Sequence, residues 1–211
     1  MTHQELVQHI NEFHNTANLF EAIGGNIPVP GINIGGQNNE GAYSARFHNY
    51  LLALGINNDF NNPLNGVNGP QPDIAFLNEN NEPNSIIEFG HYMVVQIAAN
   101  EGPLGSNCIV AKFEADLVNG YPNHVIFNAI PQVNKHFVYL LRDMIVVPPE
   151  PYIPNRGNHV PLDRLMRIAN VTVQTQQYCN DNLFTYARID TPIANINGLQ
   201  YRFIVYVMCM A

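Results

Sequence analysis

Apolar residues recur at helical spacing in two stretches of the N-terminal half. Residues 2–23 place them on one face and stop at Gly24-Gly25, which predicts a helix that ends there. Residues 40–55 repeat the pattern and predict a second helix. The segments after these two helices, 26–39 and 56–71, are rich in Asn, Gly and Pro and predict loops.

Short apolar runs predict strands at 73–77 and 85–89, and the stretch 91–99 is apolar without a clear period. Further along, we predict a helix at 108–120, a strand at 124–130, a helix running into a strand at 136–147, and a short helix at 161–169. The runs VTVQTQQY, LFTYARI and LQYRFIVYVMCM predict that the chain ends in strands.

These elements predict one domain over residues 1–211, of the α/β (α+β) class, with a mixed central sheet flanked by helices. Residues 1–39 would supply an N-terminal helix and loop, and 40–147 the core. The proline-rich connector PPEPYIP would then lead into a β-rich extension over 148–211.

Charge is scarce in this chain. Charged residues make up 12 % of it, against about 25 % in ordinary domains. Lys112 and Lys135 are its two lysines, and the net charge is −8. A surface with so few charges has little to prevent self-association and little with which to neutralise phosphates. Partners are therefore expected to be further copies of the same chain, with DNA a partner only for a nuclease.

No apolar run approaches the roughly 20 residues of a membrane helix. The first residues lack a basic segment followed by an apolar one, so no secretory signal is predicted. We expect a soluble protein with no membrane partner. The three cysteines, Cys108, Cys179 and Cys209, lie far apart and form no CxxC pair. They predict buried thiols or, alternatively, a disulfide, including one between chains.

The stretch PDIAFLNENNEPNSIIEFGHY, residues 72–92, predicts a hairpin that carries two carboxylates. If Asn80-Asn81 form the tip, opposite residues have numbers that add up to 161, and Asp73 faces Glu88. Their Cβ atoms would lie about 5 Å apart. Two like charges this close become favourable when a cation such as Mg²⁺ lies between them. Pro83 cannot donate to the ladder, and a one-residue slip would place the acids on opposite faces.

In these residues the sequence resembles the PD-(D/E)XK nuclease superfamily, the proteins with a restriction-endonuclease-like core. The similarity covers roughly residues 40–120. It consists of Glu40 near the start of a helix, Pro72-Asp73 at the start of a strand, and Ile86-Ile87-Glu88-Phe89 at the end of the next.

The resemblance implies a role for each of these residues. Asp73 and Glu88 would bind the metal, which is Mg²⁺, and Glu40 would support it. A lysine two residues after the glutamate would orient or activate the attacking water, but this chain has Gly90 there. Some members supply that lysine from the next helix, where Lys112 is the candidate. His91 is a candidate for acid–base chemistry.

Two functions follow from the sequence, and whether the chain is an enzyme stays open. The first is a Mg²⁺-dependent DNA endonuclease that uses Glu40, Asp73 and Glu88, with Lys112 or His91 in place of the missing lysine. The second is a non-catalytic structural, storage or binding protein that self-associates on a degenerate nuclease-like fold. The low charge and the altered motif favour the second.

Overall fold

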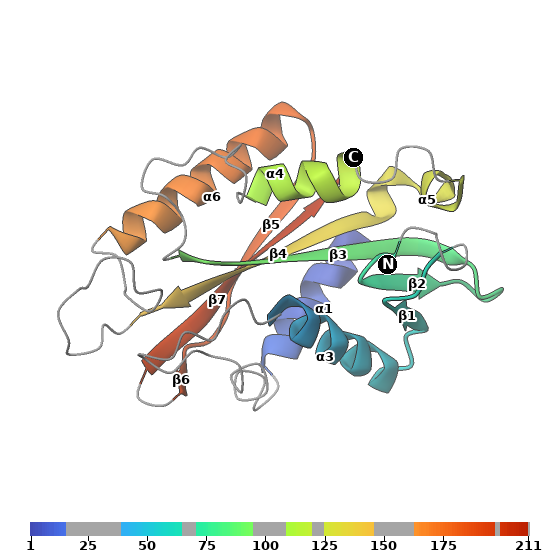
Figure 1. Ribbon diagram of the computed structural model, residues 1–211, viewed down its shortest axis with the longest axis horizontal. Helices are drawn as coiled ribbons and strands as arrows, with labels where there is room; N and C mark the ends of the chain where they lie inside the picture. The colour runs from blue at the N-terminus through green and yellow to red at the C-terminus, as the bar shows by residue number, and fades with distance from the viewer. Residues whose placement is uncertain are drawn as a thin grey trace.

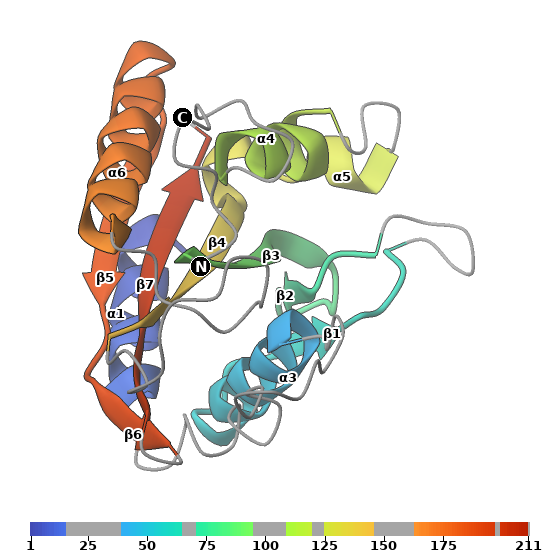
Figure 2. The same cartoon turned by 60° about the vertical axis from the view of Figure 1, so that its left-hand side comes forward.

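The computed structural model describes residues 1–15, 39–64, 71–94, 109–119, 125–145, 163–196 and 199–210. They form a mixed sheet with helices on both of its faces, as Figure 1 and Figure 2 show from two directions. The α/β class with a central mixed sheet flanked by helices, predicted from the sequence, is confirmed.

The N-terminal half holds two helices and a meander of three strands. Its elements are α1 (His3–Asn15), α3 (Asn39–Ala53), β1 (Asn58–Phe60), β2 (Ile74–Leu77) and β3 (Pro83–Met93). Both predicted helices are confirmed over the described residues; positions 16–23 of the first lie outside them. Strand β1 forms inside a segment predicted as a loop, because its backbone pairs with β2.

The C-terminal half holds the other described helices and four strands. Its elements are α4 (Ile109–Phe113), a π-helical turn (Glu114–Val118), α5 (Val125–Ala129), a 3-10 turn (Gln132–Asn134), β4 (Lys135–Met144), α6 (Arg164–Asp181), β5 (Thr185–Asp190), β6 (Ala194–Ile196) and β7 (Leu199–Cys209). The helix predicted at 108–120 and the strands predicted from LFTYARI and LQYRFIVYVMCM are confirmed.

Three other sequence predictions in this half are wrong. The run at 124–130 forms α5 rather than a strand, and 136–144 forms strand β4 without a helical part. VTVQTQQY lies in α6, where the buried residues recur every three or four positions: Ile168, Val171, Thr175 and Cys179. That spacing suits a helix packed on a sheet, and tertiary burial overrides the β-propensity of Val and Thr here.

The strand order in the sheet is β1-β2-β3-β4-β7-β5, with β6 paired to β7. Strands β3 and β4 are parallel, and the other neighbours are antiparallel. Because β7 lies between β4 and β5, the segment after residue 148 completes the central sheet and is not a separate β-rich extension.

The helices divide between the two faces of the sheet (Figure 1). Helices α1 and α3 cover one face, on which Ile87 and Phe89 of β3 are buried. Helices α4, α5 and α6 cover the other face, on which Ile86 is buried. Alternate residues of β3 thus reach opposite helix layers, as the two-residue period of a strand requires. Among the described residues, no helix has both the length and the apolarity of a membrane span.

The hairpin between β2 and β3 has the predicted register where it approaches the carboxylates. Ile74 pairs with Ile87, and these numbers add up to 161. At the tip, Leu77 pairs with Pro83, so the register shifts by one residue there. Asn81 has a φ of 60°, the left-handed conformation that asparagine tolerates. The irregularity that proline introduces is therefore confined to the end of the hairpin away from Asp73.

Candidate functional site

The candidate site lies along the part of β3 that extends beyond β2. Strand β2 begins at Ile74, whereas β3 continues to Met93, so the last N–H groups of β3 on this edge need other acceptors. The Phe89 N–H donates to Oδ2 of Asp73 at 2.7 Å. The N–H of His91 donates to the carboxylate of Glu40. Asp73 and Glu40, two of the acids predicted from the sequence, thus accept hydrogen bonds from N–H groups of β3 that have no partner in β2.

Glu88 lies between these contacts and is buried, with 8 % of its surface exposed. Its carboxylate accepts a hydrogen bond from the backbone N–H of Asp73. Its Oε1 atom is buried and has no hydrogen-bond partner in the described structure. A buried, unpartnered carboxylate oxygen is unfavourable unless a cation or a donor reaches it.

Lys112 of α4 reaches the motif position from the helix layer above. A Cβ atom built at Gly90 would lie 3.4 Å from Cε of Lys112. It would also lie 2.9 Å from Cδ2 of Tyr139 and 3.0 Å from Cζ of Phe137. The space that a side chain at position 90 would use is therefore filled by two rings and by the Lys112 stem. Position 90 and Glu88 face the same side of β3, so Lys112 approaches the face that carries Glu88.

A fourth carboxylate, Asp116, belongs to the same cluster and was not among the sequence candidates. It lies in the π-helical turn that continues α4, four residues after Lys112. Its charge raises the pKa of Glu40, Asp73 and Glu88. The i, i+4 spacing from Lys112 was the available sequence signal, but that spacing is equally typical of a solvent-exposed helix face.

Burial is the largest cause of the altered acidity of all four carboxyl groups. It raises the pKa of Glu40 to about 7, although the nearby Lys112 opposes this. Burial likewise raises the pKa of Asp73 and of Asp116, and raises that of Glu88 well above its usual range. Neighbouring acids add to the increase for Glu88 because each disfavours the ionisation of the others. Clusters of carboxyl groups with raised pKa values are typical of catalytic and cation-binding sites.

The donors present here fit a hard divalent cation. Asp73 and Glu88 offer carboxylate oxygens, including the unpartnered Oε1. Mg²⁺ is bound in proteins by one or two carboxylates and retains several water molecules. Among the described residues, the carboxylates do not form a closed cage of three ligand atoms within 4.8 Å of one another.

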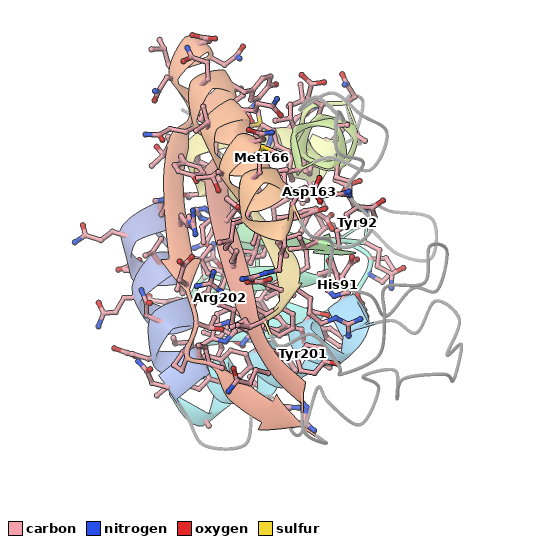
Figure 3. The ribbon with its side chains drawn as sticks, turned by 90° about the vertical axis from the view of Figure 1, so that its left-hand side faces the viewer. His91, Tyr92, Asp163, Met166, Tyr201 and Arg202 are labelled. Atoms are coloured by element: carbon pink, nitrogen blue, oxygen red, sulfur yellow. The ribbon has the colours of Figure 1, made fainter. Side chains whose placement is uncertain are left out.

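The side chain of His91 does not lie with these carboxylates. The ring of His91 packs against Phe203, with ring centroids 6.4 Å apart, on the face that α1 and α3 cover. Figure 3 views the side of the molecule on which His91 lies. Burial lowers the pKa of His91 to about 3, so the ring is neutral at pH 7. The ring therefore lies on the opposite face of β3 from Glu88, and the acid–base role of His91 stays a prediction.

Two of the three cysteines lie in the described part of the chain, and both are buried. Cys179 and Cys209 are unpaired and buried, with 0 % and 2 % of their surfaces exposed. Buried thiols were one of the two sequence-based alternatives, and these two positions agree with it. Cys108 lies outside the described residues.

The tight environment of Gly90 leads to a direct prediction. Gly90→Ala is expected to lower the free energy of unfolding by about 1–3 kcal/mol, because the new methyl group overlaps two buried rings. Chemical denaturation of both proteins measures the difference. The double variant Gly90→Ala/Phe137→Leu removes one of the rings and should recover part of the loss. A single variant as stable as the wild type would contradict the packing described for this strand.

Comparison of the chain with models of protein families, with curated proteins and with solved structures finds no match.

Proposed function

We propose that this protein is a Mg²⁺-dependent DNA endonuclease of the PD-(D/E)XK kind. One observation carries the proposal: the stem of Lys112 packs at Gly90, on the strand face that carries the buried Glu88. The lysine absent from the motif position is thus replaced by one from the next helix. The hydrogen bonds that place Asp73 and Glu40 on the same strand edge add to this support.

Each residue then has a defined task. Asp73 and Glu88 hold the cation, and Glu40 hydrogen-bonds β3 beside them. The ammonium group of Lys112 orients the attacking water and stabilises negative charge that develops on the phosphate. Bound Mg²⁺ supplies a Lewis acid and lowers the pKa of a coordinated water.

Glu40 adds a carboxyl group whose pKa lies near neutral pH. Its pKa of about 7 in the metal-free protein allows it to hold or release a proton near neutral pH. General acid–base catalysis is most efficient when the pKa of the group lies near the working pH.

The net charge of −8 sets a condition on this function. Binding of DNA cannot depend on a general positive field, because the chain has nine Lys and Arg residues against seventeen Asp and Glu. We expect the divalent cation to supply much of the local attraction for the phosphate. Cleavage should therefore depend steeply on the concentration of Mg²⁺.

The other expectation, a non-catalytic protein that self-associates, stays a prediction. Its support was the low charge and the missing motif lysine. The position of Lys112 weakens the second of these reasons, and burial removes Cys179 and Cys209 as bridges between chains.

Cleavage of supercoiled plasmid DNA tests the proposal directly. The full chain is incubated with the plasmid and Mg²⁺ or Mn²⁺, and the nicked and linear products are measured over time. We expect cleavage that requires the metal. Glu88→Gln should be at least about 100-fold slower, because it removes a ligand charge without changing the shape of the side chain.

Glu82→Gln is the matched control, since Glu82 is an exposed acid on the same hairpin and should have no effect. Absence of cleavage with either metal would overturn the proposal, and sedimentation would then measure self-association. Equal cleavage by wild type and Glu88→Gln would also overturn it, because the activity would not belong to this site.

A further inference from the structure

A second cluster of metal-binding side chains lies away from the carboxylates. His136 at the start of β4 pairs directly with Cys209 at the end of β7. Opposite residues of antiparallel strands hold their side chains on the same face, about 5 Å apart. His3, in the first turn of α1, completes the cluster. One nitrogen of each histidine and the sulfur of Cys209 all lie within 4.8 Å of one another.

One ring nitrogen of His136 has a hydrogen-bond partner, and the other has none among the described residues. Its Nε2 lies 3.1 Å from the carbonyl oxygen of Met1, so the hydrogen belongs on Nε2. The other nitrogen, Nδ1, then carries the lone pair; it is buried and has no partner in the described structure. A histidine that donates one N–H to a backbone carbonyl and keeps the other nitrogen available has the arrangement typical of metal ligands.

His3 shows the same lack of partners. Both of its ring nitrogens are buried and have no hydrogen-bond partner among the described residues. The two histidine rings lie with their centroids 6.3 Å apart, and His136 has 0 % of its surface exposed. Buried ring nitrogens without partners are costly. One nitrogen of each histidine lies beside the Cys209 thiol, an arrangement that suits a bound cation.

The protonation states of the two histidines suit a metal, whereas the Cys209 thiol has to release its proton to become a ligand. Burial lowers the pKa of His136 to about 4 and lowers that of His3, so both rings are neutral at pH 7. Burial raises the pKa of Cys209 to about 12, and its sulfur lies 3.0 Å from the carbonyl oxygen of Val133 as a hydrogen-bond donor. Binding of a metal would release this one proton, because the thiolate is the ligand.

We propose that His3, His136 and Cys209 bind one Zn²⁺ ion, with the fourth position left to water. Two imidazoles and one thiolate form a borderline-soft donor set, which zinc prefers over Mg²⁺. The ion would join α1 to the ends of β4 and β7, elements that are far apart in the chain. Ligands at roughly 2.0–2.3 Å from a tetrahedral zinc lie less than about 4 Å from one another, and the three atoms here already lie within 4.8 Å, so a small approach completes the site. His3 can supply this movement because it lies at the end of a helix.

This site is separate from the proposed nuclease site. His136 lies on the same side of the sheet as its β3 partner Ile87, under α1 and α3. Glu88 and Lys112 lie on the other face. Zinc binding can therefore be tested without reference to DNA cleavage, and either proposal can fail alone.

Titration of the chelator-treated full chain with Co²⁺ and Zn²⁺ tests the inference. We expect one equivalent of Co²⁺ to produce a thiolate-to-cobalt charge-transfer band in the near ultraviolet, which Zn²⁺ then removes. Zinc at about 100 times its Kd should raise Tm by roughly 5–10 °C.

Variants identify the ligands. Cys209→Ser and His3→Gln should each weaken Zn²⁺ binding at least tenfold and abolish the rise in Tm. Cys179→Ser is the matched control, because Cys179 is equally buried but packs on the other face of the sheet. His3→Gln acts on a residue outside the sheet, so it keeps the test valid if Cys209→Ser does not fold. A cobalt band that survives in Cys209→Ser, or no one-equivalent binding in the wild type, would overturn the proposal.

Discussion

Lys112→Met is expected to slow DNA cleavage by about 10²–10³-fold while leaving the fold intact. Methionine keeps the unbranched stem that packs against Gly90 and removes the ammonium group. Loss of a single preorganised donor to a developing oxyanion typically costs this much in kcat. Plasmid cleavage under single-turnover conditions measures the rate, and Mn²⁺ titration shows whether the metal still binds.

Lys135→Met is the matched control for this prediction. It makes the same substitution at the chain's other lysine, whose ammonium lies 4.0 Å from the ring centroid of Phe127. Cleavage by Lys135→Met should stay within a few-fold of the wild type. If Lys112→Met cleaves at the wild-type rate, Lys112 does not replace the motif lysine, even if the protein proves to be a nuclease.

Glu88→Gln is expected to stabilise the metal-free protein at pH 8 by roughly 1–3 kcal/mol and to have little effect at pH 4. The folded protein raises the pKa of Glu88 well above its unfolded value. Below the unfolded pKa of about 4.3 the group is protonated in both states, so its contribution to stability is fully present. As the pH rises above this value, the unfolded state releases the proton and the folded state keeps it. Stability is lost over this interval, and glutamine, which has no charge, avoids the loss.

The measurement is the difference in the free energy of unfolding between wild type and variant, by urea titration from pH 4 to pH 8. A difference is needed because three buried histidines, His14, His91 and His136, act in the opposite direction. Burial lowers their pKa values to about 3, 3 and 4, so they favour the folded state as the pH rises. Glu82→Gln, at an exposed position, should show no such difference.

Excess Mg²⁺ should reverse the sign of this difference at pH 8. The ion stabilises the ionised wild-type carboxylates and finds one ligand fewer in Glu88→Gln. A variant that is less stable than the wild type at pH 8 without metal would contradict the account of these acids as a strained cation site. Sites built for binding or catalysis are commonly held at such a cost to stability.

Sequence patterns were reliable where short-range rules decide the structure. The hairpin followed from its turn residues and the two-residue period of a strand, but the turn runs from Asn78 to Glu82 rather than over Asn80-Asn81 alone. The predicted register, in which Ile74 pairs with Ile87, is reached after the irregularity between Phe76 and Leu77, and Asp73 lies one residue before this first ladder pair. Pro83 shifted the register only at the tip. The helix at 40–55 followed from its apolar face, and the acid Glu40 lies in its first turn.

The prediction of secondary structure was wrong where an element is buried on both sides, because its apolar residues then show no periodic pattern. The run HFVYLLRDM is apolar on both faces because β4 lies in the middle of the sheet, and such a run does not distinguish a strand from a helix. In α6 the β-branched residues of VTVQTQQY suggested a strand, but the helix packs its buried side on the sheet. Local propensity was too weak to oppose this packing.

By itself, then, the sequence determined that Asp73 and Glu88 lie near each other at one end of a hairpin, because turn residues and strand period act over a few positions. Only the tertiary structure decided that Lys112 packs at Gly90. This contact depends on how α4, which lies between β3 and β4 in the sequence, packs on the face of the sheet formed by these two parallel strands. It also decided that His3, His136 and Cys209 lie together. These residues are far apart in the sequence, and the pairing of β4 with β7 and the packing of α1 on the sheet bring them close. Contacts between distant segments are set by the burial of whole elements, which no short pattern specifies.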